Sequence, residues 1–390
     1  MNIGVDSRSL GPMKTGVGTY VAEVLRHWPA SPSRDSFALF SHQAIDYPET
    51  PAVQHRVAHA RRGLPWYLLQ SRRLISQSPL ALFWGTQGLL PLRLPKPLPA
   101  VITIHDCVHQ QGFRYAPSVP YNWAHRCLLP SAVRRARRIL VVSRFVADEV
   151  MRCFRLPASK IEVTPLGARR ELFGEVLSAT GGDAGVETGP GKVAQHQAAV
   201  LAKYKIKSPF VLGVGTLEPR KNLRTLLEAF ALLPSRLTNR FQLVLAGKPG
   251  WGTTSLEKYL QNYGQRSSLI LTGYVPEEDL RALYASTEMF VFPSFYEGFG
   301  LPVVEALASG CPVIASTAPS LKEVAGSAAI FVDPKSPPEE WSRAMVRVAE
   351  SAELRHSLAI AGQEQARQFS WETCAQQTSE VLRSVAEGRE

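Results

Sequence analysis

Short apolar runs alternate along this sequence with longer segments of helical periodicity, and this alternation constrains the fold more than any other feature. Strands that alternate with helices pair in parallel, because each crossover helix returns the chain to the same edge of the sheet. The predicted strands are Asn2–Val5, Phe37–Phe40, Leu80–Trp84, Ala100–Ile104, Arg138–Val142, Lys160–Thr164, Phe210–Gly215, Gln242–Ala246, Ser268–Thr272, Met289–Phe292, Pro312–Ala315 and Ala329–Val332. The predicted helices include Gly18–Trp28, Ser143–Phe154, Leu223–Leu233, Leu301–Ala308 and Ser336–Gly362. The sequence therefore predicts an α/β protein with doubly wound parallel sheets.

The pattern runs through the chain twice, once before about residue 170 and again from about residue 208. At roughly 100–200 residues per domain, 390 residues fit two domains, and a hydrophobic fraction of 45% gives each a sizeable core. We predict domains at 1–170 and 208–370, joined by an interdomain segment at 171–207. Within that segment Gly174–Val193 is rich in glycine, acidic and free of aromatic residues, which is typical of a flexible connection. Two such domains facing each other across a cleft would bind ligands at the carboxyl ends of their strands.

The cysteines and the N-terminal residues indicate the cellular compartment in which this protein is expected. Five cysteines without a Cys-x-x-Cys pair argue against a disulfide framework or a cysteine zinc site, and they fit a reducing cytosol. Met1–Asp6 resembles a first strand rather than a signal peptide, and no apolar stretch reaches about 18 residues. We therefore expect a cytoplasmic protein that meets a membrane only at its surface.

Positive charge is concentrated in the first half of the chain. Residues 1–170 contain 23 Lys and Arg against 9 Asp and Glu, an excess larger than the net charge of +11 of the whole chain. Such asymmetry predicts an anionic partner: nucleic acid, an anionic membrane surface or a phosphate-rich substrate. The arginines are scattered and no recognition-helix, OB or RRM signature accompanies them, which argues against nucleic acid.

Two groups of arginines favour the membrane surface among these partners. One group flanks Leu64–Leu69, whose Trp66 and Tyr67 are residue types that settle at the level of lipid headgroups. The alternative is a core helix whose arginines form its solvated face. The two groups are Arg61, Arg62, Arg72 and Arg73, and Arg134, Arg135, Arg137 and Arg138. We predict that the first domain rests on an anionic bilayer.

A glycine-rich turn lies between the first predicted strand and the first predicted helix. Its Gly16 and Gly18 would let backbone amides approach a phosphate at the helix N-terminus. Val21 replaces the third glycine of a dinucleotide fingerprint, which argues against NAD. A tight turn without a ligand is the alternative.

His105 follows the apolar run Val101–Ile104 and therefore stands at the carboxyl end of a predicted strand. A histidine in this position can act as a base, a hydrogen-bond partner or a metal ligand. Its neighbours Asp106 and His109 match no common zinc spacing, so we predict no metal site. A purely structural histidine is the alternative.

A pair of cations, Arg220 and Lys221, follows the predicted strand Phe210–Gly215. Such a pair can hold a diphosphate, Arg through its planar fork and Lys as a point charge. An ordinary solvated loop is the alternative.

The segment Pro293–Ala306 follows a predicted strand and opens a helix. Gly298 and Gly300 keep its backbone open, so that amides at the helix end can meet an anion. Glu297 stands before the helix and Glu305 eight residues later, about 80° past two full turns, so both carboxylates can point toward one site. A capping Glu with an unrelated surface Glu is the alternative, which the apolar neighbours disfavour.

Glu297 and Glu305 form an E-x7-E pattern that resembles the motif of retaining glycosyltransferases of family 4, which have the two-Rossmann-domain architecture called GT-B. The resemblance covers nearly the whole chain. It includes the Gly16/Gly18 turn, Val141–Ser143, Pro165–Gly167, Arg220–Asn222, Thr272–Val275 and Ala308–Val313. It implies transfer of a sugar from a nucleotide-diphosphate sugar to an acceptor hydroxyl, with retention and without a metal or other cofactor.

The resemblance also implies a role for each matching position. Glu297 resembles the carboxylate that contacts the donor sugar, and Glu305 the one that binds the ribose hydroxyls. His105 resembles the histidine near the sugar's 6-hydroxyl and the acceptor. The positions that resemble those around the diphosphate are Arg220, Lys221, Gly16, Gly18, Gly298, Phe299, Gly300 and Leu301, and those at the base are Tyr274 and Val275. Residues 371–390 resemble the terminal helix that crosses back to the first domain.

The variant Thr-x-x-Pro-Arg-Lys-Asn, together with His105, is most similar to bacterial mannosyl- and rhamnosyltransferases of surface-polysaccharide assembly. We therefore expect a hexosyltransferase with GDP-mannose as the first candidate donor. Its expected acceptor is a lipid-diphosphate-linked saccharide of polysaccharide or O-antigen assembly, met at the inner face of the cytoplasmic membrane. Two other classes stay open: a nucleotide-sugar epimerase of the same architecture and a basic nucleic-acid-binding protein.

Overall fold

The computed structural model describes residues 1–30, 35–60, 63–110, 119–169, 172, 190–250, 252, 254–261, 263–264 and 266–389. The chain divides into two compact units, and the chain passes between them twice. The first unit comprises Met1–Gly167 with Ser370–Glu390, and the second comprises Ala168–Phe369.

The first unit is built on a parallel sheet of seven strands in the order β3-β2-β1-β4-β5-β6-β7. The strands are β1 (Asn2–Asp6), β2 (Ser36–Ser41), β3 (Val53–Val57), β4 (Leu82–Gly85), β5 (Ala100–Ile104), β6 (Arg138–Val141) and β7 (Ile161–Val163). The sequence did not predict β3. This edge strand alternates buried or half-buried with exposed residues, so it has no continuous apolar run.

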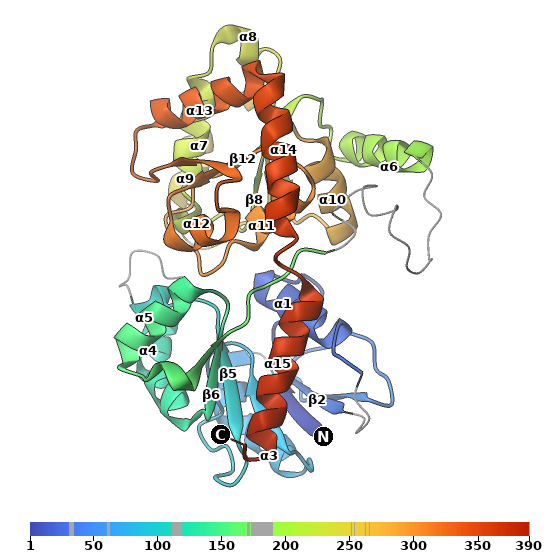
Figure 1. The fold of residues 1–390 in the computed structure, drawn as a ribbon, viewed down its shortest axis with the longest axis vertical. Coiled ribbons are helices and arrows are strands. Elements are labelled where there is room, and N and C mark those ends of the chain that lie inside the picture. Colours follow the sequence, from blue (N-terminus) through green and yellow to red (C-terminus); the bar gives the residue numbers. More distant parts are fainter. Residues whose placement is uncertain are drawn as a thin grey trace. The chain divides into compact units, whose positions relative to one another are not determined.

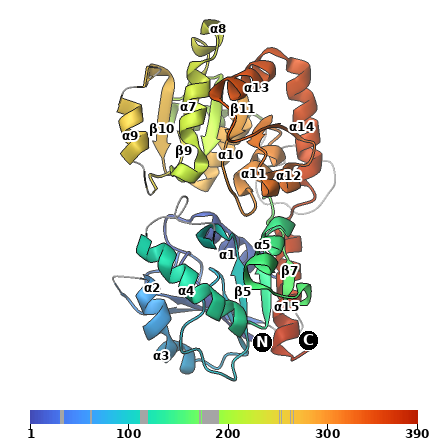
Figure 2. The same ribbon diagram turned by 90° about the vertical axis from the view of Figure 1, so that its left-hand side faces the viewer.

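The helices of the first unit flank this sheet (Figures 1 and 2). They are α1 (Gly16–Arg26), α2 (Gly63–Pro65), α3 (Ser71–Ser76), α4 (Val119–Arg135), α5 (Arg144–Phe154) and α15 (Trp371–Ala386). Although α15 is last in the sequence, it packs against α1 and against β4, β5 and β6. Arg383 on α15 donates to Asp35 at 2.7 Å. The C-terminal residues therefore complete the first unit.

The second unit contains a parallel sheet of six strands in the order β10-β9-β8-β11-β12-β13. The strands are β8 (Phe210–Val214), β9 (Gln242–Ala246), β10 (Leu269–Gly273), β11 (Met289–Phe292), β12 (Val313–Ser316) and β13 (Ala329–Val332). The helices are α6 (Pro190–Lys203), α7 (Leu223–Ala231), α8 (Ser235–Thr238), α9 (Thr254–Gln261), α10 (Glu277–Ser286), α11 (Leu301–Ala308), α12 (Pro319–Ala325), α13 (Pro338–Glu350) and α14 (Ala352–Ala366).

Two predictions for the second unit differ from the structure. The single helix predicted at Ser336–Gly362 is two helices, because Ser351 leaves the helical conformation and its hydroxyl accepts from the Leu354 amide as an N-cap. Pro190–Val193, predicted as part of a flexible segment, begins α6, because proline is tolerated in a first turn and the alanine-rich sequence after it favours helix. The rest of that segment, 174–189, lies outside the described residues.

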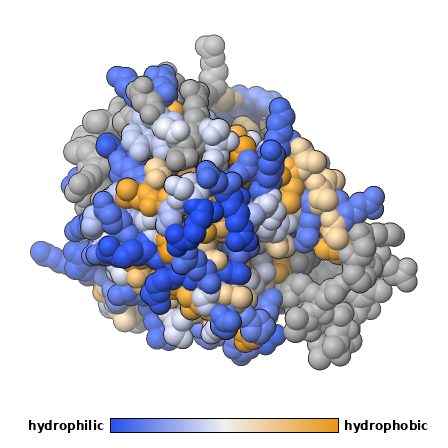
Figure 3. All heavy atoms as spheres, turned by 90° about the horizontal axis from the view of Figure 1, so that it is seen from above, coloured by the Kyte–Doolittle hydropathy of each residue, from blue (hydrophilic) through white to orange (hydrophobic). Residues whose placement is uncertain are grey.

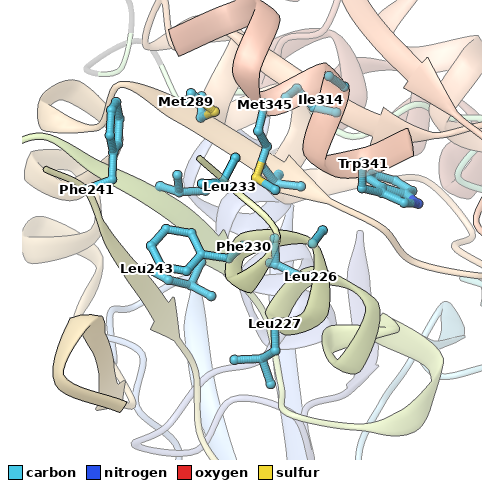
Figure 4. Close-up of a cluster of buried hydrophobic side chains, with 14 of the residues drawn as sticks. Leu226, Leu227, Phe230, Leu233, Phe241, Leu243, Met289, Ile314, Trp341 and Met345 are labelled. Carbon is cyan, nitrogen blue, oxygen red and sulfur yellow. The ribbon is translucent and has the colours of Figure 1, made fainter. Parts of the chain in front are cut away.

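The core of the second unit lies between its sheet and the pair α7 and α13 (Figure 4). Alternate strand residues supply the sheet side of this cluster: Val211, Leu243, Leu245, Met289, Val291 and Ile314. The intervening residues face the opposite side, where Phe290 packs edge-on against Tyr284 of α10. Burial of both faces explains why these strands are continuous apolar runs in the sequence. In contrast, the face of the molecule in Figure 3 is mostly hydrophilic.

The two aromatic residues of the arginine-flanked segment Leu64–Leu69 belong to the core of the first unit. Trp66 and Tyr67 are buried, and the Tyr67 hydroxyl donates to the Leu89 carbonyl at 2.9 Å. The interpretation of this segment as a core helix is therefore correct for these two rings, and they do not lie at the surface as headgroup-level residues would. Arg61 and Arg62 lie outside the described residues. Among the helices in the described ranges, none is both long and apolar enough to cross a bilayer.

Candidate active site

Glu297 lies in the loop between β11 and α11 and is almost completely buried. Its Oε1 accepts from the Lys221 ammonium at 2.7 Å and from the Ser294 hydroxyl at 2.5 Å. Its Oε2 accepts from Nη1 of Arg220 at 2.8 Å. Both oxygens of this carboxylate are therefore held by donors from its own loop and from the loop after β8.

The charges around Glu297 keep it ionised. Burial by itself would raise the pKa of Glu297, but Arg220 and Lys221 outweigh it and bring that pKa to about 2. Burial lowers the pKa of the Lys221 ammonium, and Glu297 only partly offsets this. At such close contact we regard the pair as an ionised carboxylate and ammonium at neutral pH, because each charge stabilises the other.

Arg220 joins this carboxylate to a second one. Its Nε and Nη2 donate to Glu218 at 2.9 and 2.6 Å, and its Nη1 also donates to the Tyr296 carbonyl at 2.8 Å. The backbone carbonyl of Arg220 accepts from the Phe295 amide at 2.9 Å. The two predicted cations are thus paired with two carboxylates, Glu218 and Glu297.

Topology explains why these two loops meet. Strands β8 and β11 are neighbours, and the strand order reverses between them, with β9 and β10 on one side and β12 and β13 on the other. In parallel α/β sheets, ligands bind outside the carboxyl ends of the strands at this reversal. The Glu297 network therefore stands at the position of the second sheet where a ligand site is expected.

Glu305 is the second predicted carboxylate, and α11 places it in a separate buried cluster. Its Oε2 accepts from the Tyr284 hydroxyl at 3.2 Å. Its Oε1 lies 3.3 Å from Nη2 of Arg169, whose Nε lies 2.8 Å from Glu277. Both glutamates are therefore buried and partnered, which excludes the alternative of an unrelated surface glutamate.

The turn Gly298–Leu301 forms the N-terminal end of α11. Gly300 has φ +109°, a left-handed conformation that favours glycine, and a Cβ there would lie 2.4 Å from Leu321. The Glu297 carbonyl accepts from the Ser320 hydroxyl at 2.7 Å, and both apolar residues of the turn, Phe299 and Leu301, are buried. These contacts fix the loop from Glu297 to the first turn of the helix.

The remaining predicted residues of this unit, Tyr274 and Val275, follow β10, which is the outermost strand on one side of the sheet. Tyr274 is 39% exposed and Val275 is buried. Both residues lie at the carboxyl ends of the parallel strands, as the Glu297 network does. They are two strands away from β8, because β9 lies between β10 and β8.

Gly16 and Gly18 begin α1 in the first unit. A Cβ at Gly18 would lie 2.4 Å from the Ser9 carbonyl oxygen, so that glycine is required by packing alone. Gly16 has nothing within 4 Å of the Cβ position, so its surroundings leave room for a ligand. The two glycines thus differ in what requires them.

His105 follows β5 and points its Nε2 at the Thr86 carbonyl oxygen, 2.8 Å away. Because a carbonyl only accepts, Nε2 carries the proton, and a neutral ring then presents Nδ1 as an acceptor. The ring packs edge-on against Tyr20 of α1, with ring centroids 4.9 Å apart. His105 therefore has a fixed orientation and a fixed tautomer.

We expect the His105 imidazole to take up a proton at lower pH than an ordinary histidine. Burial lowers its pKa from the usual 6.5, and the bond to Thr86 and the charge of Asp106 only partly offset that effect. A ¹⁵N NMR titration of the imidazoles checks this, and the midpoint of His105 should lie below that of the exposed histidines. A midpoint at or above theirs would contradict the assignment.

Sequence reasoning missed four residues of the two clusters: Ser294, Glu218, Tyr284 and Arg169. The first two stand within the motifs that contain Glu297 and Arg220, so proximity along the chain was an available signal. Arg169 follows the Pro165–Gly167 motif by two residues, but nothing local indicates its partner. Among the described residues, no group of three His, Cys, Asp or Glu side chains is placed to hold a metal ion.

Comparison with known proteins identifies the family. The model for glycosyl transferases group 1 matches residues 199–365, and the model for Glycosyltransferase Family 4 matches residues 14–171. The O-antigen chain mannosyltransferase B of Escherichia coli is 32% identical over 384 residues, which are 93% of this chain and 94% of that protein.

Solved structures identify the fold. The sucrose-phosphate synthase of Thermosynechococcus elongatus superposes with a TM-score of 0.75 at 20% identity, covering 100% of both chains. Anabaena HepE, solved in complex with UDP and glucose, gives a TM-score of 0.74 at 19% identity, covering 98% of this chain and 99% of that chain. The predicted GT-B fold with two Rossmann-like units is confirmed. The family models and the end-to-end match to the mannosyltransferase together show that this chain belongs to glycosyltransferase family 4.

Proposed function

We propose that this glycosyltransferase moves a hexose with retention from a nucleotide-diphosphate sugar to a hydroxyl of a lipid-linked saccharide, with GDP-mannose as its donor. The observation that carries the proposal is the buried network of Glu297, Lys221 and Arg220 at the strand-order reversal of the second sheet. A fixed carboxylate beside two cations and a helix N-terminus suits a sugar that becomes positive while its leaving group becomes negative.

The proposed reaction follows from these charges. The anomeric C–O bond breaks with its electron pair on the diphosphate, and Lys221, Arg220 and the amides that open α11 stabilise that charge in place of a metal. Preorganised donors of this kind each contribute roughly 3–4 kcal/mol to transition-state stabilisation. The acceptor oxygen bonds to the anomeric carbon on the same face, and its proton passes to the departing phosphate oxygen. In this proposal Glu297 contacts the reacting sugar, Glu305 contacts the ribose, and His105 is assigned to the sugar and the acceptor.

The relatives support the donor and the acceptor classes. A mannosyltransferase named for the O-antigen chain matches 93% of this chain, which supports mannose as the sugar and a surface polysaccharide as the product. A structure of the same fold holds UDP and glucose, which supports a nucleotide sugar as the donor class.

One assay separates this proposal from its rivals. The protein is incubated with GDP-mannose, GDP-rhamnose, UDP-glucose and UDP-N-acetylglucosamine, each with and without a diphosphate-linked lipid saccharide and with EDTA. We expect acceptor-dependent release of GDP in EDTA, with the α-anomeric configuration of the donor retained in the product by NMR. Donor turnover without acceptor would indicate an epimerase, and a loss of activity restored by Mg²⁺ would reject the metal-free mechanism.

We also propose that the first unit attaches peripherally to an anionic membrane. The described residues limit which side chains of this unit can form the attachment surface. Arg135 donates to the carbonyls of Pro95, Lys96 and Leu98, so it serves the fold rather than a surface. In contrast, Leu69 and Leu92 are 63% and 51% exposed. They lie on adjacent segments, because the Leu92 amide donates to the carbonyl of Leu68, the neighbour of Leu69, at 3.1 Å. Their exposed neighbours in the sequence are Arg72, Arg73 and Arg93.

Replacing Arg72, Arg73 and Arg93 together by Gln should weaken binding to vesicles of anionic lipid, because each arginine near such a surface contributes about 1 kcal/mol. Sedimentation with phosphatidylglycerol vesicles measures this, and binding should also fall steeply as salt rises. The control replaces Arg236, Arg343 and Arg347 of the second unit. Equal partitioning onto neutral vesicles, or none at low salt, would reject membrane attachment and leave the transferase assignment intact.

A further inference from the structure

Arg169 is the first charged residue after the chain enters the second unit, and its side chain is only 8% exposed. We propose that Arg169 is a positioning residue for donor binding, which holds the Glu305 carboxylate in the charge state and orientation that the ribose of the donor requires. The inference rests on the proposed function, in which Glu305 binds the ribose hydroxyls.

The geometry gives each oxygen of Glu305 one partner. Nη2 of Arg169 lies 3.3 Å from Oε1, and the hydroxyl of the fully buried Tyr284 donates to Oε2 at 3.2 Å. A carboxylate accepts hydrogen bonds along about four lone-pair directions. The proposed function assigns two adjacent hydroxyls, the 2′ and 3′ hydroxyls of a ribose, to this carboxylate.

The charge of Arg169 is what makes Glu305 a strong acceptor. Glu305 is 5% exposed on α11, and a carboxylate this buried is costly unless a cation accompanies it. Of Tyr284 and Arg169, which both contact this carboxylate, Tyr284 is neutral, because burial raises the pKa of its phenol well above the usual 10. Arg169 is the cationic partner, and hydrogen bonds to an ionised acceptor are roughly twice as strong as those to a neutral one.

The backbone of Arg169 is anchored independently of Glu305. The amide of the preceding Ala168 donates to the carbonyl of Phe369 at 3.0 Å, and the Arg169 carbonyl accepts from the Leu172 amide at 3.0 Å. The first of these bonds joins the segment that enters the second unit to the segment that leaves it. The backbone of Arg169 is therefore held in place without Glu305, as a positioning role requires.

A purely structural role is the competing interpretation, because Arg169 also lies 2.8 Å from Glu277 at the start of α10. A structural role of Arg169 would depend on Glu277, whereas a positioning role would depend on Glu305, so substituting Glu277 alone distinguishes the two interpretations. Glu277 is half exposed and Glu305 is buried, so Glu277→Gln removes the negative charge at the α10 contact and leaves the Glu305 pair in place. It is the matched control for variants of Arg169.

The test compares binding of GDP and of 2′,3′-dideoxy-GDP by calorimetry, with UDP and 2′,3′-dideoxy-UDP as the second pair. We expect wild type to prefer the ribose-containing nucleotide by about 10- to 100-fold, the range for hydrogen bonds to a charged group. Arg169→Met should reduce that ratio toward 1 and raise donor KM by a similar factor with kcat nearly unchanged. Glu277→Gln should keep the wild-type ratio.

Arg169→Lys keeps the charge but offers one ammonium in place of a fork, so its ratio should lie between those of wild type and Arg169→Met. This variant decides the matter if Met at this position prevents folding. A wild-type ratio in either Arg169 variant would overturn the positioning role alone. Equal affinity of wild type for both nucleotides would instead overturn the ribose role of Glu305 on which the inference rests.

Discussion

Glu297→Gln is expected to lower kcat by about 10²- to 10³-fold while changing the affinity for nucleoside diphosphate only a few-fold, the size of effect seen when one preorganised charge-stabilising group is removed. Gln keeps the shape of Glu297 and can accept from Ser294, but it loses the negative charge that faces Lys221 and Arg220. Steady-state kinetics with GDP-mannose and lipid acceptor, combined with calorimetry of GDP binding, measures both quantities.

Two further variants, Glu305→Gln and Glu228→Gln, serve as references for the kinetics of Glu297→Gln. Glu305→Gln should mainly raise the donor KM, because Glu305 is assigned to the ribose and not to the reacting sugar. Glu228→Gln removes the charge of the half-buried partner of Arg224 on α7 and should leave both constants unchanged. Loss of a buried partner costs up to about 3–5 kcal/mol of stability, so all variants are assayed well below their melting midpoints. Full activity of Glu297→Gln would remove the catalytic assignment.

Gly167→Ala is expected to destabilise the first unit by about 3 kcal/mol, the upper part of the range for overpacking. A Cβ at Gly167 would lie 2.1 Å from the Trp371 amide nitrogen and 2.3 Å from the Ser370 carbonyl carbon. These are backbone atoms at the start of α15, so they cannot turn aside as a side chain can. Differential scanning calorimetry should show a fall in Tm of roughly 6–12 °C, at about 2–4 °C per kcal/mol for a unit of this size.

Gly264→Ala is the control for this variant, because no atom lies within 4 Å of the Cβ position there. Its stability should stay within about 0.5 kcal/mol of wild type, as for most surface substitutions. Equal melting points for Gly167→Ala and wild type would show that the approach of the two chain segments is looser than the structure indicates.

Much of the fold was predictable because its signals are local. Strands such as Ala100–Ile104 and Met289–Phe292 are buried on both faces, so each is a continuous apolar run whose observed bounds equal the predicted ones. The edge strand β3 has one exposed face and no such run, and it was missed. Ser351 was read as a helix interior because a cap depends on backbone conformation, which a helical pattern on both sides conceals.

In the candidate site, too, some features are visible in the local sequence and others only in the structure. The spacing of Glu297 and Glu305 around a helix start, and the cations Arg220 and Lys221 after a strand, are visible in single short segments. The sequence did not indicate that these cations are ion-paired, whereas the structure pairs them with Glu218 and Glu297. Residue types indicate which charges exist, and only the packed loops show which of them neutralise one another.

By itself, the sequence determined the parallel α/β architecture, the positions of most strands and helices and the two glutamates, since apolar periodicity and helix-start chemistry are properties of neighbouring residues. The tertiary structure decided which distant segments meet. It paired Arg169 with Glu305, placed the loops after β8 and β11 together and pressed Gly167 against the start of α15. Such pairings depend on strand order and on steric fit between segments far apart in the chain, and no local pattern encodes either of these.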